Sequence, residues 1–245
     1  MKHYIFDVDG TLTPSRGVID PTFKKWFLDF CSKNNVYLVT GSDKPKTLEQ
    51  IGFEIYNKCK KVYQCSGSEV YIGDNVCYVN AWTLPDDARQ WLLNALEDSD
   101  FDIRTGNHIE QRVGMVNFSV VGRNANQQER KAYVDYEAWN GEREHIAGLF
   151  NADFPHLEAT VGGETGIDIA PKGSDKSQIL RDFDKYDEIY FFGDAIFYGG
   201  NDYPLASALT NFNTISTSYR VENWEDTFNK LKGLNMNYEE LIGQW

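Results

Sequence analysis

Two aspartates near the start of the chain, Asp7 and Asp9, have the residue type and spacing for phosphoryl-transfer chemistry. They follow residues 4–6 (Tyr-Ile-Phe), which predict a buried strand, and Gly10 after them permits a sharp turn. One carboxylate at such a strand end can attack phosphorus and bind Mg²⁺, while the other shuttles a proton. The alternative is a plain turn or an incomplete Ca²⁺ loop, but an EF-hand needs a Glu where this chain has Arg16. We therefore interpret the pair as catalytic.

Both ends of the chain alternate strands with helices. The predicted elements are a strand at 4–6, a helix at 21–33 with Asp20 as N-cap, a strand at 36–40, a helix from Pro45 to Gly52, short strands within 61–79, a helix from Asp175, a strand at 188–192, a strand near 214–216 and a helix from Trp224. This order predicts an α/β fold with a doubly wound parallel sheet. Ligands of such sheets bind at the carboxyl ends of the strands, where Asp7 and Ser42 both lie.

The middle third of the chain follows a different, mixed pattern. Its predicted elements are a helix from Pro85, a long β run at 114–122, helices at 127–139 and 142–150, and an antiparallel pair at 157–161 and 165–170. We expect a discontinuous core domain of residues 1–80 and 174–245, interrupted by an inserted α+β domain of residues 81–173.

Composition narrows the class of protein. With 245 residues the chain can bury a large core in two domains, and its formal net charge of −13 argues against nucleic-acid binding. An anionic substrate therefore needs a locally built cationic site, which makes the few arginines informative. No apolar run is long enough to span a bilayer and no hydrophobic leader precedes the first strand, so we expect no membrane association and a cytoplasmic protein. The cysteines lack zinc-site spacing and are expected to be reduced thiols: Cys31, Cys59, Cys65 and Cys77.

The segment of residues 6–13, FDVDGTLT, resembles the nucleophile motif of the haloacid dehalogenase superfamily of phosphotransferases. The resemblance implies that Asp7 is the nucleophile that becomes an aspartyl-phosphate. It implies that Asp9 is the general acid and base, with its backbone carbonyl on Mg²⁺. Ser42, or Thr40 in its place, would hydrogen-bond the transferring phosphoryl group.

Two later motifs of the same superfamily follow in order. By resemblance, Lys176 would neutralise charge between the phosphate and the nucleophile, and Asp194 would complete the metal shell, with Asp202 nearby. The transition state of phosphoryl transfer carries spread negative charge, so it requires a metal, a cation and fixed donors. Ligands that are all oxygen favour Mg²⁺.

The inserted segment contains residues 112–119 (RVGMVNFS), 122–123, 129–130 and 161–168. These residues resemble the cap of eukaryotic-type phosphomannomutases, a covering domain that closes over the substrate. It implies that arginines bind the substrate phosphate or line its entry, namely Arg16, Arg112, Arg123 and Arg130. Guanidinium groups suit this role because they bind phosphate bidentately. The resemblance also implies that Asp168 contacts sugar hydroxyls, with Gly166 two positions earlier, and that the protein forms a homodimer through its caps.

Some positions depart from that family's pattern. Gly166 stands where Ser is usual, and Val113 replaces an expected Asn. Ala206, Ala208 and Asn211 lie where the family builds a further cation site partly from an Asp and a Thr. Sugar preference, mannose against glucose phosphates, and a second cation therefore stay open.

The activity implied by the resemblance is interconversion of mannose 1-phosphate and mannose 6-phosphate, with Mg²⁺ and with hexose 1,6-bisphosphate as activator and intermediate. The main alternative is a sugar-phosphate phosphatase on the same fold, with water as acceptor, because fold alone does not fix function. A second alternative is a binding protein that has lost turnover. Intact Asp7, Asp9, Lys176 and Asp194 argue against the latter.

Overall fold

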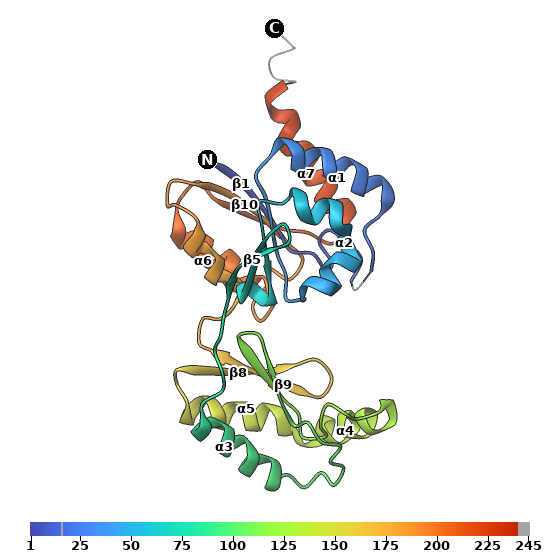
Figure 1. The fold of residues 1–245 in the computed structure, drawn as a ribbon, viewed down its shortest axis with the longest axis vertical. Helices are drawn as coiled ribbons and strands as arrows, with labels where there is room; N and C mark the ends of the chain where they lie inside the picture. The colour runs from blue at the N-terminus through green and yellow to red at the C-terminus, as the bar shows by residue number, and fades with distance from the viewer. Residues whose placement is uncertain (16, 240–245) are drawn as a thin grey trace. The chain divides into compact units, whose positions relative to one another are not determined.

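The computed structural model describes residues 1–15 and 17–239, so the predicted site residue Arg16 lies outside the described residues. The chain divides into two compact units, drawn in Figure 1. Unit 1 comprises Met1–Val79 and Asp175–Trp245, and unit 2 comprises Asn80–Ser174. Within the described residues, no helix is long and apolar enough to cross a bilayer.

Unit 1 is built on a seven-stranded sheet with the strand order β11-β10-β1-β2-β3-β4-β5. The strands are β1 (Lys2–Phe6), β2 (Val36–Val39), β3 (Lys61–Gln64), β4 (Glu69–Ile72), β5 (Asn75–Val79), β10 (Glu188–Gly193) and β11 (Thr217–Arg220). The strands from β11 to β3 run parallel, and β4 and β5 are added antiparallel at one edge. The predicted doubly wound parallel sheet is confirmed, and its central strand β1 carries Asp7 at its carboxyl end.

Helices cover both faces of this sheet. On one face lie α1 (Pro21–Lys33), α2 (Lys44–Lys58) and α7 (Trp224–Glu239), which pack against Phe6 of β1 and Leu38 of β2. On the other face lie η2 (Lys176–Asp182), a 3₁₀ helix, and α6 (Tyr203–Phe212), which pack against Ile5 and Val39. Neighbouring residues of one strand thus face opposite layers, as pleating requires.

Helix boundaries confirm some predictions and correct others. Asp20 caps α1 as predicted, because its side chain accepts hydrogen bonds from the backbone of Thr22 and Phe23. The prediction that Gly52 ends the second helix is wrong: Gly52 has φ 78° and ψ 158°, and α2 resumes beyond this kink as far as Lys58. The helix predicted from Asp175 is the 3₁₀ segment η2, capped by the Asp175 side chain. Helix α6 was not predicted at all.

Unit 2 consists of a four-stranded antiparallel sheet with three helices packed on it. The strand order is β6-β7-β9-β8. The elements are α3 (Asp86–Glu97), β6 (Ile109–Arg112), β7 (Met115–Phe118), α4 (Gln127–Asn140), α5 (Glu142–Asp153), β8 (Leu157–Gly162) and β9 (Gly166–Pro171). The β run predicted at 114–122 is shorter, since only 115–118 form β7, and Val120 and Val121 are buried in a loop that packs in the core of this unit.

The two faces of the unit 2 sheet differ in chemistry. Val116, Phe118 and Ile169 belong to the buried core shared with the helices. On the opposite face a polar row crosses the sheet, because Glu110 pairs with Asn117, Asn117 with Asp168, and Asp168 with Thr160 in the strand register. Strand alternation therefore gives unit 2 an apolar face for its helices and a polar face for other contacts.

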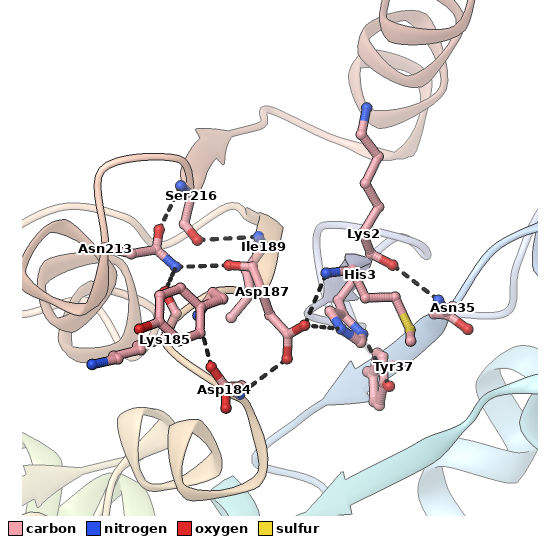
Figure 2. A network of polar contacts seen from close by, with 12 residues as sticks. Lys2, His3, Asn35, Tyr37, Asp184, Lys185, Asp187, Ile189, Asn213 and Ser216 are labelled. Atoms are coloured by element: carbon pink, nitrogen blue, oxygen red, sulfur yellow. Dashed lines mark hydrogen bonds and ion pairs between the residues drawn. The ribbon is translucent and has the colours of Figure 1, made fainter.

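A polar network ties the amino ends of β1 and β10 together (Figure 2). One carboxylate oxygen of Asp187 lies 3.0 Å from the ammonium group of Met1 and 3.1 Å from Nε2 of His3. The other oxygen accepts a 3.0 Å hydrogen bond from the backbone of Asp184. Nδ1 of His3, which is buried, lies 3.1 Å from the hydroxyl of Tyr37. These contacts fix the end of the sheet that is remote from Asp7.

Candidate active site

The nucleophile loop follows β1 and is held by backbone contacts. The Asp7 amide donates to the carbonyl of Phe192 on β10 at 2.9 Å, and the Gly10 amide donates to the carbonyl of Thr13 at 2.9 Å. Gly10 has φ +73°, and a Cβ there would lie 2.4 Å from a carboxylate oxygen of Asp194. Only glycine therefore permits both the turn and the close approach of that carboxylate.

Lys176 brings its ammonium group into the centre of unit 1. Its side chain is fully buried, and Nζ lies 2.6 Å from Oδ1 of Asp7 and 2.7 Å from Oδ1 of Asp202. Burial alone would lower the pKa of Lys176, but Asp7 and Asp202 outweigh it and raise that pKa. The lysine is therefore held as a cation beside the predicted nucleophile, as a phosphoryl-transfer site requires.

Three carboxylates surround this ammonium group. Oxygen atoms of Asp7, Asp194 and Asp202 lie within 4.8 Å of one another. Burial, then the neighbouring Asp202 and Asp194, raises the pKa of Asp7 to about 7 in spite of Lys176. Burial and Asp202 also raise the pKa of Asp194. Asp7 and Asp202 are buried and Asp194 is half-buried; three carboxyl groups against one ammonium group favour a bound divalent ion, and an all-oxygen donor set fits Mg²⁺.

Asp9 points away from this cluster, toward β2 and α2. Its Oδ1 accepts a 2.8 Å hydrogen bond from Nε2 of Gln50, and Oδ2 lies 3.5 Å from the hydroxyl of Ser42. The hydroxyl of Thr40, the alternative to Ser42, accepts from the Ser42 backbone at 3.1 Å. The structure thus brings Asp9 and Ser42 together and turns Thr40 toward the backbone. The carboxylate of Asp9 is not part of the metal-type cluster.

The arginines predicted in unit 2 are paired with glutamates. Arg112 forms a hydrogen-bonded ion pair with Glu110, at 2.7 Å through Nε, and Nε of Arg123 lies 3.4 Å from the same carboxylate. Arg130 pairs separately with Glu164 at 3.1 Å. Arg112 and Arg123 therefore converge on one anion, whereas Arg130 does not join them at Glu110.

Asp168 and Gly166 lie together on the polar face of unit 2. Oδ1 of Asp168 accepts a 2.6 Å hydrogen bond from Nδ2 of Asn117, which is buried. A Cβ on Gly166 would lie 2.4 Å from the same amide nitrogen, and a Cβ on Gly162 would lie 2.4 Å from the Asp168 carboxylate. Two glycines thus make room for the Asn117–Asp168 pair.

Comparison with known proteins decides the family of this chain. A sequence model described as eukaryotic phosphomannomutase matches residues 23–237. Phosphomannomutase 1 of Dictyostelium discoideum is 33% identical over 240 residues, which cover 94% of this chain and 95% of that protein. The chain belongs to the eukaryotic phosphomannomutase family.

Solved structures similar to this chain show the fold. A trehalose-6-phosphate phosphatase of Aspergillus fumigatus superposes with a TM-score of 0.61 at 14% identity, covering 96% of this chain and 92% of that one. A haloacid dehalogenase-like hydrolase of Bacteroides thetaiotaomicron gives 0.59 at 14% identity, covering 96% and 99%. The fold is therefore haloacid dehalogenase-like, as predicted.

Membership of the phosphomannomutase family confirms the family predicted from the motifs. It makes the chain an enzyme of a phosphohexomutase family, which argues against the interpretation as a binding protein without turnover. It also favours a mutase over the alternative of a sugar-phosphate phosphatase.

Sequence reasoning missed or underrated several side chains of the phosphomannomutase site. Asp202 was expected only near the metal, whereas it bonds Lys176 directly. Gln50, Glu110 and Asn117 were not predicted. Gln50 left no signal in the sequence, because it lies between Leu48 and Ile51 and off their helical spacing, although the structure buries it.

Proposed function

We propose that the protein interconverts mannose 1-phosphate and mannose 6-phosphate through an aspartyl-phosphate at Asp7 and a hexose 1,6-bisphosphate intermediate. The observation that carries the proposal is the buried contact of Lys176 with Asp7 at 2.6 Å, in a chain of the eukaryotic phosphomannomutase family. A carboxylate beside a fixed cation can receive a phosphoryl group while the developing charge is neutralised.

The proposed reaction has two half-reactions at unit 1. An oxygen of Asp7 forms a bond to phosphorus of the bisphosphate, the bond from phosphorus to the sugar oxygen breaks, and that oxygen takes a proton from Asp9. The sugar monophosphate then presents its other end, Asp9 removes the proton of the attacking hydroxyl, and the phosphoryl group leaves Asp7. Ser42 and Lys176 hold the group during transfer.

We infer Mg²⁺ as the cofactor, held by Asp7, Asp194 and the backbone carbonyl of Asp9, with Asp202 as a further carboxylate beside them. The support is the all-oxygen cluster of Asp7, Asp194 and Asp202. When bound, Mg²⁺ supplies positive charge that offsets the negative charge of the transferring phosphoryl group.

Unit 2 is proposed to hold the end of the substrate that is not reacting. Arg112, Arg123 and Arg130 bind its phosphate, with Arg16 from unit 1, and Asp168 with Gly166 contacts the sugar hydroxyls. The support is the convergence of Arg112 and Arg123 on Glu110, since two guanidinium groups that bind one carboxylate also suit phosphate. Exclusion of water by this unit would favour transfer to sugar over hydrolysis.

The test supplies mannose 1-phosphate, Mg²⁺ and a trace of hexose 1,6-bisphosphate, and follows mannose 6-phosphate and inorganic phosphate separately. We expect the 6-phosphate to dominate and Asp7→Asn to abolish both turnover and phosphoenzyme while the protein stays folded. Stoichiometric inorganic phosphate without 6-phosphate would instead identify a phosphatase. Parallel assays with glucose 1-phosphate determine the sugar preference.

Two further parts of the proposal concern the whole protein. We propose a homodimer formed through unit 2, to be checked by light scattering of the purified protein. We also propose that the enzyme acts in the cytoplasm, to be checked by fractionation of cells that express it. The homodimer follows from the family resemblance, and the cytoplasmic location follows from the sequence-based expectation of a protein without membrane association.

A further inference from the structure

Gln50 is a completely buried polar residue that contacts a proposed catalytic group. Its side chain is 0% exposed on α2, and Nε2 donates to Oδ1 of Asp9 at 2.8 Å and, more weakly, to the hydroxyl of Thr13 at 3.4 Å. Its backbone carbonyl accepts from the amide of Ile19 at 2.8 Å. Among the described residues, Oε1 of Gln50 has no hydrogen-bond partner.

Burial of the Gln50 amide lowers the stability of the folded protein, because its Oε1 has no hydrogen-bond partner among the described residues. A buried amide oxygen without a partner destabilises the folded state, so an apolar side chain of similar size would stabilise α2 better. Rotating the amide would satisfy nothing, because it would set Oε1 against the carboxylate of Asp9. The hydrogen bond from Nε2 to Asp9 is the strongest side-chain contact that the residue makes.

We propose that Gln50 is a positioning residue that fixes the carboxylate of Asp9 for proton transfer to and from the sugar oxygen. The inference rests on the acid–base role proposed for Asp9. A carboxylate rotates easily about its terminal torsion, and a donor at 2.8 Å on Oδ1 restricts that rotation. Asp9 then presents its proton in one direction when the bond between phosphorus and the sugar oxygen breaks.

The choice of phosphoryl donor separates this role from a structural one. Departure of a sugar oxygen requires a proton from Asp9, whereas acetate leaves acetyl phosphate without one. A group that acts through Asp9 therefore affects phosphorylation of Asp7 by hexose 1,6-bisphosphate and spares phosphorylation by acetyl phosphate. A group that merely supports the fold affects both donors equally.

The full-length enzyme with Mg²⁺ is tested as Gln50→Met, Gln50→Glu and Asp9→Asn. Gln50→Met keeps the volume and removes the donor, and Gln50→Glu keeps the shape but sets a second carboxylate against Asp9. The matched control is Gln64→Met, because Gln64 is also fully buried in unit 1 but bonds Thr47 and Tyr56 instead. Single-turnover phosphoenzyme formation is measured with each donor, and the melting temperature of every variant is recorded.

We expect both Gln50 variants to slow phosphorylation by the bisphosphate about 10²-fold, with acetyl phosphate changed by less than about threefold. In steady state kcat should fall while KM for mannose 1-phosphate stays within about twofold. Gln64→Met should shift both donors together or neither. Equal slowing with both donors, or none with either, would overturn the role of Gln50. If Asp9→Asn also slowed both donors equally, the acid–base role of Asp9 itself would be wrong.

Discussion

At the scale of single residues, Lys176 shows what motifs predict and what they leave out. Its role was expected from the order of motifs, because a lysine beside Asp175 at a helix start has no distinctive spacing of its own. The structure adds that its ammonium group bonds both Asp7 and Asp202, 169 and 26 residues away in sequence. Partners so remote are fixed by the tertiary fold, which explains why Asp202 was underrated and the Gln50–Asp9 contact was not anticipated.

Asp7 should couple magnesium binding to pH. Its pKa is raised to about 7, mainly by burial, so the neutral carboxyl predominates below that pH and the carboxylate above it. Because Mg²⁺ binds the carboxylate, its affinity should rise as pH increases through about 7, and binding should release a proton. Isothermal titration calorimetry in buffers of different ionisation enthalpy measures this release. In Asp7→Asn it should vanish, and pH-independent affinity around neutrality would contradict the argument.

Gly166 should tolerate a side chain only at the expense of the Asn117–Asp168 contact. In Gly166→Ala the new Cβ would lie 2.4 Å from Nδ2 of Asn117, so this amide must move and its hydrogen bond to Asp168 is lost. We expect KM for mannose 1-phosphate to rise severalfold and stability to fall by about 1 kcal/mol. Steady-state kinetics and urea unfolding measure the two effects.

The matched control for Gly166→Ala is Gly148→Ala. Gly148 lies within α5, and a Cβ there would meet no atom within 4 Å. The exchange should stabilise the protein by up to about 1 kcal/mol through helix propensity, with KM unchanged. An equal rise in KM in both variants would mean that the effect does not come from the Asn117–Asp168 contact.

At the scale of elements, Asp20 and Gly141 marked helix ends correctly in the sequence, whereas Gly52 did not. Asp20 caps α1, and the helices predicted at 127–139 and 142–150 were separated correctly because Gly141 takes a left-handed φ between them. Gly52 carries the same local signal but lies at a kink inside α2. The β run at 114–122 was overestimated because Val120 and Val121 are apolar for burial in a loop, which hydrophobicity alone cannot distinguish from a strand.

Arg143 on α5 should hold the turn between β8 and β9. Its guanidinium donates to the carbonyl of Gly163 at 3.0 Å and pairs with Glu137 of α4 at 2.7 Å, with both side chains largely buried. Arg143→Met would leave the Glu137 carboxylate without its cation, so we expect a loss of about 3 kcal/mol in urea unfolding. Arg143→Lys should lose less, because it keeps the charge.

An exposed ion pair on the neighbouring helix α4 serves as the comparison for Arg143. Lys131 and Asp135 lie 2.5 Å apart on α4 with most of both side chains exposed, so Lys131→Met should cost less than about 1 kcal/mol. If Arg143→Met cost no more than Lys131→Met, the turn would not depend on the buried ion pair.

At the scale of the whole molecule, the network at the amino ends of β1 and β10 should make stability sensitive to acid. Burial alone would raise the pKa of Asp187, but the Asp184 amide, the ammonium group of Met1 and His3 outweigh it and lower that pKa to about 2. A lowered carboxyl pKa stabilises the folded state above the unfolded value of about 4, and this contribution is lost as pH falls toward 2.

The measurement compares thermal unfolding of the parent protein and Asp187→Asn across that acid range. The stability difference between the two should be largest above pH 4 and should shrink toward pH 2. Asp29→Asn, which removes an exposed surface partner of Lys33, should show no such trend. A difference between parent and Asp187→Asn that stayed constant with pH would contradict the role given to Asp187.

The order in which the chain is synthesised determines when the sheet of unit 1 can be completed. Strand β1, the middle one of the five parallel strands, pairs with β10, so the register that joins Lys2 to Glu188 must wait until residue 188 has left the ribosome. Unit 2 is one continuous stretch that includes all four strands of its own sheet. Loop-closure entropy therefore favours unit 2 as the first part to become ordered during synthesis. Asp7 and Asp9 reach their positions in the site only after β10 has been made and has paired with β1.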